Sequence, residues 1–277
     1  MMELPEVNNI KNQLSENIIG KRIKTVKPPT KIHKFCWYNG DVAQYDNLIK
    51  GASVNSAEGF GIFVEIGFDN GYKLCFNDGV NVRLIDEDKI RKDYQLLIEF
   101  EDESKLLFNV AMYGSIILHH NDYNNEYYIK SKEGISPFSS EFKKYYYDLF
   151  TKVKPVCSAK AFLATEQRIP GIGNGVLQDI LFDAGIHPKR RINTFTEEDK
   201  EKLLNSITNI LKSMIDKGGR DTEKDIFGNE GGYKVLLSKN TFKSPCPKCG
   251  GVLKKETYLG GSIYYCPCCQ KNSDIMI

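Results

Sequence analysis

Five of the eight cysteines in this 277-residue chain lie close together near its C-terminal end, where their spacing restricts the fold. Cys246 and Cys249 are separated by two residues, sixteen residues follow, and Cys266 and Cys269 repeat the first spacing. Two such pairs, joined by a hairpin, present four thiolates to one tetrahedral Zn²⁺ ion. We therefore predict a C-terminal zinc finger with one structural Zn²⁺.

One detail of this metal site stays open at the level of the sequence. Cys268 is also within reach of the metal, so the identity of the fourth ligand is open between Cys268 and Cys269. Zinc-finger peptides gain about 10–16 kcal/mol from their metal, and we expect this small module to depend on Zn²⁺ for its folding in the same way.

The composition is that of an ordinary soluble protein, with 41% apolar and 27% charged residues. No apolar run is as long as a membrane span, and the first residues lack the pattern of a secretory signal, so we expect a cytoplasmic protein without a membrane partner. In a protein of this kind, clustered cysteines favour a metal site over a set of disulfide bonds. The net charge of +2 neither requires nor excludes nucleic acid, because charged patches matter more than the total.

A glycine-rich stretch in the second half of the chain predicts two short helices joined by a turn. Ser158 is a suitable N-cap for good helix formers from Ala159 to Gln167, and Pro170 and the glycines that follow end this helix. Apolar residues then recur at one-turn spacing from residue 176 until Gly185 provides a stop signal.

The turn itself has the composition of a phosphate-binding site. Gly171, Gly173 and Gly175 leave their backbone N–H groups uncovered, at the positive end of the second helix. Asn174 adds a side-chain donor, and Lys160 lies nearby in the sequence. The alternative interpretation is a plain helical hairpin whose glycines only turn the chain, since isolated glycine motifs are weak evidence.

The first residues predict a helix. Pro5 suits its first turn, Gly20 suits its end, and Glu3 precedes its N-terminus. One face of this helix carries apolar residues at helical spacing, namely Val7, Ile10, Leu14 and Ile18.

From residue 21 to about residue 128 the pattern changes to that of strands. Ile62–Phe68 and Tyr72–Asn77 are separated by Asp-Asn-Gly, a strong hairpin signal, and Gln95–Asp102 and Lys105–Gly114 form another candidate hairpin. Several short strands at this spacing favour an antiparallel β-sandwich. The run KIHKFCWY, from residue 31 to residue 38, mixes basic with aromatic residues. We interpret it as a strand that packs its aromatics inward and assign it no site role.

These motifs resemble those of the formamidopyrimidine-DNA glycosylase and endonuclease VIII family over nearly the whole chain. The family has a lysine-bearing helix, a G-x-G-N turn and a helix that ends near A-G-I-H-P, which Lys160, Gly173, Asn174 and residues 184–188 match. The opening E-L-P-E-V, at residues 3–7, is similar to the family's catalytic terminus.

The resemblance implies an α+β fold of three parts. Residues 1–130 would form an antiparallel β-sandwich domain that includes the N-terminal helix. Residues 131–235 would form a helix-two-turn-helix domain that binds DNA, and residues 236–277 would form the four-cysteine zinc finger.

The resemblance also implies roles for individual residues. Lys160, Gly173 and Asn174 match positions that grip the DNA backbone beside the lesion, and Glu3 matches the acid that acts on the deoxyribose. The family's lyase nucleophile is an exposed N-terminal proline, but Met2 stands at that position here. A bulky Met2 should keep Met1 in place, so the terminal amine would be primary and displaced by one residue.

Other departures fall at positions that face the lesion. Phe60 replaces the usual lysine, and Met112 and Tyr113 replace the arginine and aromatic that fill the gap left by a flipped base. Met112 and Tyr113 can still act as an apolar wedge, or they are core residues at a strand end. Gly261 stands where the finger normally carries a phosphate-binding arginine, so only backbone N–H groups remain there.

Thr196 resembles the cap of a long helix that ends at Gly218 and Gly219, and one charged residue of the following loop is a candidate contact. Arg220 lies in a segment that, in the family, is close to the lesion, so it is a candidate base or phosphate contact. The alternative is a solvated loop charge.

The leading hypothesis is a base-excision repair DNA glycosylase that binds damaged DNA as a monomer, flips a damaged base and removes it. Flipping costs less at a damaged pair, which favours lesions before any chemistry. Glu3 would be the essential acid or base and would activate water. Alternatively the Met1 amine or Lys160 would attack the sugar as a primary amine and give lyase activity. In a bacterium such an enzyme would work at the nucleoid.

The second hypothesis is a DNA-binding protein that recognises lesions, abasic sites or junctions without cutting them. The altered positions favour it, whereas the retained Glu3 argues against it. A third interpretation, a zinc-ribbon module that acts through protein partners, leaves the glycine-rich turn unexplained.

Overall fold

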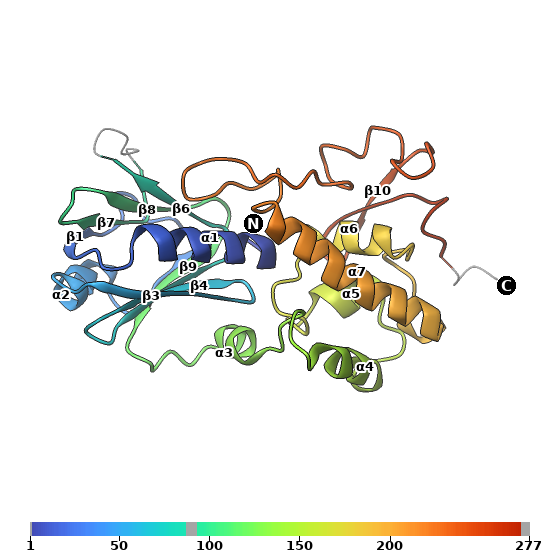
Figure 1. Cartoon of the computed structure of the whole chain (residues 1–277), viewed down its shortest axis with the longest axis horizontal. Coiled ribbons are helices and arrows are strands. Elements are labelled where there is room, and N and C mark those ends of the chain that lie inside the picture. Colours follow the sequence, from blue (N-terminus) through green and yellow to red (C-terminus); the bar gives the residue numbers. More distant parts are fainter. Residues whose placement is uncertain (1, 87–92, 273–277) are drawn as a thin grey trace.

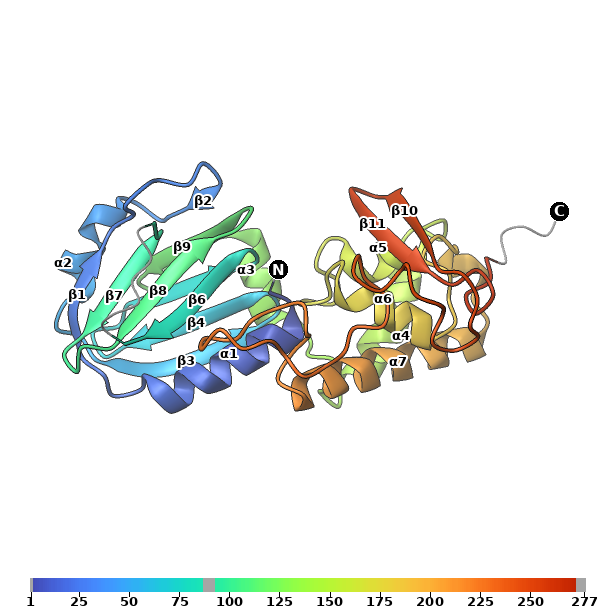
Figure 2. The same ribbon diagram turned by 90° about the horizontal axis from the view of Figure 1, so that it is seen from above.

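The computed structural model describes residues 2–86 and 93–272. A β-rich N-terminal half and a mainly helical C-terminal half lie side by side, and the N-terminus lies between them in two perpendicular views (Figure 1, Figure 2). The first residues of the chain therefore reach the boundary between the two halves, where the segment of residues 218–235 also runs.

Helix α1 spans Leu4–Asn17, as the sequence predicts. Glu3 is its N-cap residue, and the backbone N–H of Glu3 donates to Oε2 of Glu6 at 3.0 Å, which closes the first turn. The apolar face of the helix is buried, because Val7, Ile10 and Leu14 join the core of the β-rich half.

The β-rich half is a sandwich of two sheets. Within the described residues, the order is β1-β7-β8-β6 in one sheet and β2-β9-β5-β4-β3 in the other. All pairs are antiparallel except β2 with β9. The strands are β1 (Ile23–Lys27), β2 (Cys36–Trp37), β3 (Val54–Phe60), β4 (Phe63–Phe68), β5 (Lys73–Asn77), β6 (Val80–Ile85), β7 (Leu96–Phe100), β8 (Lys105–Val110) and β9 (Gly114–His119).

The two predicted hairpins, β4–β5 and β7–β8, are both present. Apolar side chains from the two sheets and from α1 form one core between them. Helix α3 (Glu126–Glu133) covers the other face of the five-stranded sheet, where Tyr128 packs against Phe60 and Phe63. Since both of its faces are covered, every residue of β4 is buried.

The segment from residue 31 to residue 38 differs from the prediction. Cys36 is buried in the core and Tyr38 packs against it, whereas Phe35 and Trp37 are 47% and 53% exposed. The predicted inward packing is wrong for Phe35 and Trp37, because β2 is a two-residue edge strand beside β9 and its alternate side chains point to solvent.

The helical half contains α4 (Phe142–Lys152), α5 (Ala159–Ala164), α6 (Val176–Asp183) and α7 (Glu197–Asp216). Its core lies between these helices, and Leu4 of α1 joins it. The short helices are α2 (Tyr45–Ile49), η1 (Val42–Gln44) and η2 (Ile192–Thr194). Helix α5 ends earlier than predicted because Glu166 and Gln167 adopt positive φ angles of 59° and 49°.

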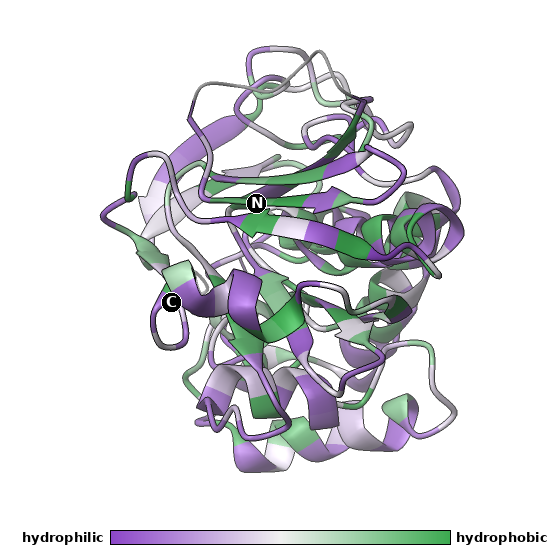
Figure 3. Ribbon diagram, turned by 90° about the vertical axis from the view of Figure 1, so that its left-hand side faces the viewer, coloured by the Kyte–Doolittle hydropathy of each residue, from purple (hydrophilic) through white to green (hydrophobic). Residues whose placement is uncertain are grey.

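A small C-terminal module packs on α6. Strands β10 (Lys254–Tyr258) and β11 (Gly261–Tyr265) form its hairpin, and Phe182 of α6 belongs to its apolar cluster. Strands and helices of both halves carry hydrophobic and hydrophilic segments in Figure 3, as expected of elements with one buried face. Among the described residues, no helix has the length and apolar character that crossing a membrane requires.

Candidate active site and nucleic-acid interface

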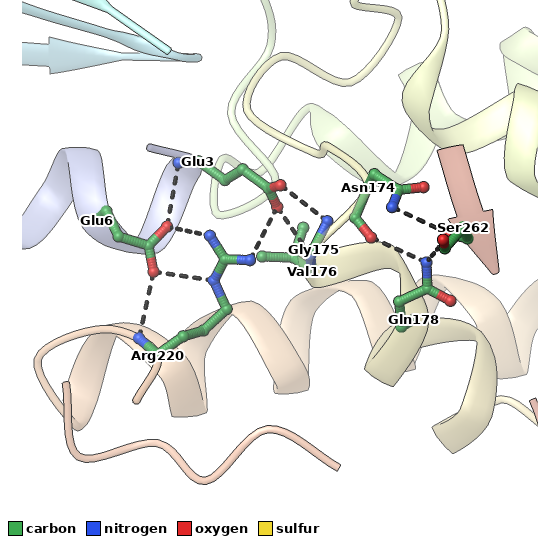
Figure 4. A network of polar contacts seen from close by, with 8 residues as sticks. All are labelled: Glu3, Glu6, Asn174, Gly175, Val176, Gln178, Arg220 and Ser262. Atoms are coloured by element: carbon green, nitrogen blue, oxygen red, sulfur yellow. Dashed lines mark hydrogen bonds and ion pairs between the residues drawn. The ribbon is translucent and has the colours of Figure 1, made fainter. Parts of the chain in front are cut away.

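The carboxylate of Glu3 is the centre of a polar network at the boundary between the two halves (Figure 4). The N–H of Gly175 donates to its Oε1 at 2.8 Å, and the N–H of Val176 donates to its Oε2 at 2.7 Å. These are unpaired donors at the start of α6, where the helix dipole also favours a negative charge. Glu3 is 3% exposed, so this anchoring determines its orientation.

The glycines of the turn are required for this close approach. A Cβ atom on Gly173 would lie 2.6 Å from Oε1 of Glu3, and one on Gly175 would lie 1.7 Å from Nη1 of Arg220. Of the three glycine N–H groups that the sequence offers to a phosphate, that of Gly175 is occupied by the Glu3 carboxylate, as is the N–H group of Val176.

Arg220 is a buried part of the same network and not a solvated loop charge. Its Nε and Nη2 atoms donate to the two oxygens of Glu6 at 3.0 and 2.7 Å, and its Nη1 atom lies 3.6 Å from Oε2 of Glu3. The side chain is 3% exposed, so the interpretation as a solvated charge is wrong, whereas its role as a base or phosphate contact stays a prediction. Burial alone would lower the pKa of Arg220, but the carboxylates of Glu3 and Glu6 raise it above its usual value.

Two adjoining hollows lie next to this network among the described residues. One, of about 290 Å³, is lined by Glu3, Asn174, Arg220 and Glu223. The other, of about 250 Å³, is lined by Glu223 as well and reaches Met112. We call these two together the Glu3 hollow. A ligand placed there would meet a fixed carboxylate at its edge.

Met2 is the first residue that the structure describes, so the predicted amine of Met1 lies outside the described residues. Met2 is 4% exposed and its side chain belongs to the apolar core of the sandwich. Its backbone N–H donates to the carbonyl oxygen of Asp78 at 2.8 Å. Met2 therefore fixes the path of the chain toward Glu3 and contributes a buried thioether, not an exposed reactive group.

Asp78 and Tyr113 form a pair beside Met2. Burial, assisted by the nearby Glu3 carboxylate, raises the pKa of Asp78 to about 6, and burial together with Asp78 raises the pKa of Tyr113. Tyr113 and Met112 lie in the turn between β8 and β9 and are 39% and 58% exposed. The alternative prediction that they are core residues is therefore wrong.

Three predicted DNA contacts meet at the finger hairpin. Lys160 is 4% exposed, and its Nζ atom donates to the carbonyl of Tyr258 at 2.6 Å. Asn174 donates to the carbonyl of Ser262 at 3.1 Å (Figure 4). A Cβ atom on Gly261 would lie only 3.2 Å from both side chains, so this glycine allows their approach. Burial lowers the pKa of Lys160.

The four cysteines of the predicted zinc site converge. The Sγ atoms of Cys246, Cys249, Cys266 and Cys269 lie within 4.8 Å of one another, with Cys246–Cys269 at 3.8 Å and Cys249–Cys266 at 3.5 Å. Tetrahedral Zn²⁺ with Zn–S bonds of about 2.3 Å requires S–S separations of about 3.8 Å. The donor set therefore fits Zn²⁺, and Cys268 lies outside this group.

The comparisons with known proteins agree with this architecture. Residues 134–225 match the family model described as formamidopyrimidine-DNA glycosylase H2TH domain. The chain is 32% identical over 283 residues to the formamidopyrimidine-DNA glycosylase of Carboxydothermus hydrogenoformans, covering 98% of this chain and 100% of that protein. The chain belongs to this family. Its members are DNA glycosylases, so the protein is an enzyme of that class.

Further relatives support family and fold. A formamidopyrimidine-DNA glycosylase of Wolbachia sp. subsp. Brugia malayi is 29% identical, with 98% of this chain and 100% of that protein covered. The structure of Lactococcus lactis Fpg with DNA that contains an abasic site has a TM-score of 0.83 and 22% identity, covering 97% of this chain and 99% of that one. The predicted fold class, a β-sandwich, a helix-two-turn-helix domain and a cysteine cluster, is confirmed.

Sequence reasoning missed several residues of the network. Glu6 has the position of an ordinary first-turn acid, and its pairing with Arg220 has no local signal. Asp78 follows a strand in the run Asn-Asp-Gly, which is typical of a turn. Gln178 donates to the carbonyl of Ser262, and only its place one turn after Asn174 could have indicated it.

Proposed function

We propose that this protein is a base-excision repair glycosylase that flips damaged bases out of DNA and hydrolyses their glycosidic bond. The observation that carries this proposal is the Glu3 carboxylate, fixed by α6 and Arg220 at the edge of the Glu3 hollow. The Lactococcus lactis relatives were solved with abasic-site DNA and with a Fapy-dG lesion, which supports damaged DNA as the partner.

In the proposed reaction Glu3 acts on water. The carboxylate accepts a proton from a water molecule while the water oxygen forms a bond to C1′ of the deoxyribose. The bond between C1′ and the base nitrogen breaks, and the base leaves with the electron pair and takes up a proton. Two N–H donors and the Arg220 guanidinium, 3.6 Å away, hold the Glu3 carboxylate in one orientation for this role.

A lyase step would need an amine that attacks C1′. Met2 at the usual proline position leaves two proposed sources, the primary amine of Met1 and the side chain of Lys160. Burial lowers the pKa of Lys160, which favours the neutral, nucleophilic amine, but its Nζ atom is engaged by Tyr258.

We propose that DNA lies across the boundary between the two halves. Met112 and Tyr113 would fill the gap left by the flipped nucleotide, and their exposure supports this role. Asn174, Lys160 and Gly261 would present the finger hairpin to the DNA backbone. The four cysteines would hold Zn²⁺, which supplies a structural cross-link for the finger.

The second candidate function is lesion binding without excision. It is favoured by the four altered positions, Met2, Phe60, Met112 and Gly261. For both functions we propose a monomer that works in the cytoplasm, at the nucleoid of a bacterium.

Base release from a panel of lesion-bearing duplexes distinguishes the two functions. We expect release by the unmutated protein, loss of release in Glu3→Gln, and unchanged release in Glu16→Gln, an exposed acid on the same helix. Release by Glu3→Gln at the normal rate would refute the assigned role of Glu3. No release from any lesion, with binding intact, would establish the binding function.

The lyase step is tested by borohydride trapping on an abasic-site duplex, followed by peptide mapping. An adduct at Met1 would show that the primary terminal amine takes the place of proline. An adduct at Lys160 would place the nucleophile in the helical half, and no adduct would leave hydrolysis alone.

A further inference from the structure

A separate hollow of about 420 Å³ lies on the other side of the Asp78–Tyr113 pair from the Glu3 hollow. Asp78 lines both, whereas Met112 faces the Glu3 hollow and Tyr113 faces this one. We call it the aromatic hollow, because aromatic side chains from separate elements line it, namely Trp37, Phe63, Tyr113, Tyr123 and Tyr127.

The aromatic hollow presents flat apolar surface to solvent. Trp37 and Tyr127 are 53% and 55% exposed, and Tyr113 is 39% exposed. Large aromatics gathered at an open hollow mark a ligand site more often than a chance arrangement. Figure 2 shows β2, which carries Trp37, on the same side of the molecule as the β10–β11 hairpin, with the N-terminus between them. The aromatic hollow therefore borders the proposed DNA path.

Amide side chains complete the lining. Oδ1 of Asn77 accepts from the N–H and Oγ of Ser115, and Oδ1 of Asn125 accepts from the first N–H groups of α3. Within residues 2–86 and 93–272, the Nδ2 groups of Asn77 and Asn125 have no hydrogen-bond partner, so they can donate to a ligand.

The helical half contributes Gln167 to the same hollow. Gln167 and Glu166 both have positive φ, and two consecutive non-glycine residues in this region cost about 1–3 kcal/mol each. This strained turn places a residue with an amide side chain, from the second half of the chain, in the lining of the aromatic hollow.

The character of the lining selects the ligand. No lysine or arginine is among the described residues that line the aromatic hollow, which argues against a phosphate. Flat aromatic faces with amide donors are what a nucleobase requires, because any base can stack and its edge can accept hydrogen bonds.

We propose that the aromatic hollow receives the unpaired base that faces the flipped nucleotide on the opposite strand. This inference rests on the proposed function, since flipping into the Glu3 hollow is what leaves that base without a partner. Met112 and Tyr113 stand between the two hollows, so one wedge would separate the extruded nucleotide from its former partner. Stacking on Trp37 and Tyr127 makes the identity of the opposite base a determinant of affinity.

Trp37 provides a direct probe, because it is the single tryptophan of the chain. Its fluorescence and the affinity would be measured with duplexes that carry a tetrahydrofuran abasic analogue opposite adenine, guanine, cytosine or thymine. A matched duplex would carry a second tetrahydrofuran in place of the opposite base. We expect Trp37 quenching only when the opposite base is present, and roughly 5- to 150-fold weaker binding of the double-abasic duplex.

Variants distinguish stacking from a general loss of binding. Trp37→Ala and Tyr127→Ala should bind both duplexes with nearly equal affinity, and Tyr127→Ala keeps the Trp37 signal. Phe138→Ala, an exposed aromatic outside the hollow, should behave like the unmutated protein. Equal quenching or equal affinity for the two duplexes in the unmutated protein would overturn the proposal. It would also be overturned if Trp37→Ala or Tyr127→Ala lowered the affinity for the two duplexes by the same factor.

Base release by the same preparations separates this inference from the proposed function. Discrimination between the duplexes without any base release would contradict the excision function and leave the aromatic hollow assigned. Base release without discrimination between the duplexes would contradict only the role proposed for the aromatic hollow.

Discussion

Replacing Arg220 with methionine tests whether the buried ion network holds the two halves of the molecule together. Arg220→Met keeps much of the side-chain volume but removes the guanidinium from between Glu3 and Glu6, both less than 6% exposed. Removing one partner of a buried ion pair costs about 3–5 kcal/mol, because it leaves an uncompensated buried charge. If the free energy of unfolding falls by about 2–3 kcal/mol for each molar of urea, the urea concentration at the unfolding midpoint would decrease by roughly 1–2 M.

A double variant tests the cause of this loss. Adding Glu6→Gln removes one of the two carboxylates that lose their partner. The double variant Arg220→Met/Glu6→Gln should therefore have a free energy of unfolding roughly 1–3 kcal/mol higher than that of Arg220→Met. The control is Arg22→Met, which breaks an exposed pair with Glu101 and should cost about 1 kcal/mol or less.

Urea unfolding at fixed pH and with Zn²⁺ present would measure all of these variants. A cost of less than about 1 kcal/mol for Arg220→Met, or further destabilisation by Glu6→Gln, would show that the buried charges are not coupled as the distances imply.

Three further predictions concern metal, packing and pH. Cys246→Ser should lose the single bound Zn²⁺ and the finger's contribution to DNA affinity, whereas Cys268→Ser should keep both, as zinc analysis and gel-shift titration would show. Gly173→Ala should slow base release by roughly 100-fold without preventing folding, because its Cβ would displace Oε1 of Glu3; a normal rate would contradict this packing. Burial alone would raise the pKa of Glu65, but bonds from its neighbours His119, Tyr128 and Lys132 lower it from 4.5 to about 2. The ionised form of Glu65 should therefore add about 3 kcal/mol to the free energy of unfolding above pH 4.5, and this contribution is lost as the pH falls toward 2. In urea unfolding measured over this pH range, Glu65→Gln should abolish that part of the acid dependence.

The features that the sequence predicts correctly depend on residues that are close together in the chain. The cysteine spacing, the Asp-Asn-Gly hairpin and the apolar face of α1 each depend on residues close together in the chain, and each is present. The end of α5 was less predictable, since Glu166 and Gln167 are not residues whose type requires positive φ.

The parts that sequence could not supply depend on distant contacts. Arg220 and Glu6 are 214 residues apart, and a loop arginine that pairs with a buried acid has the same local pattern as one that faces solvent. The sequence pattern predicts Trp37 in the core because aromatic residues in a strand usually pack inward, but the edge position of β2 leaves its side chain exposed. The anchoring of Glu3 on α6 follows from tertiary packing of the two halves.

The long separations within the Glu3 network also determine when the site can form. Glu3 leaves a ribosome before its partners Gly175 and Arg220, which follow 172 and 217 positions later. At about 5–20 residues per second, roughly 10–40 s pass before the last partner is synthesised. The β-sandwich can fold in that interval, but the Glu3 carboxylate still lacks the donors that orient it. The nascent chain is therefore expected to complete the geometry of the Glu3 network as one of the last steps of folding.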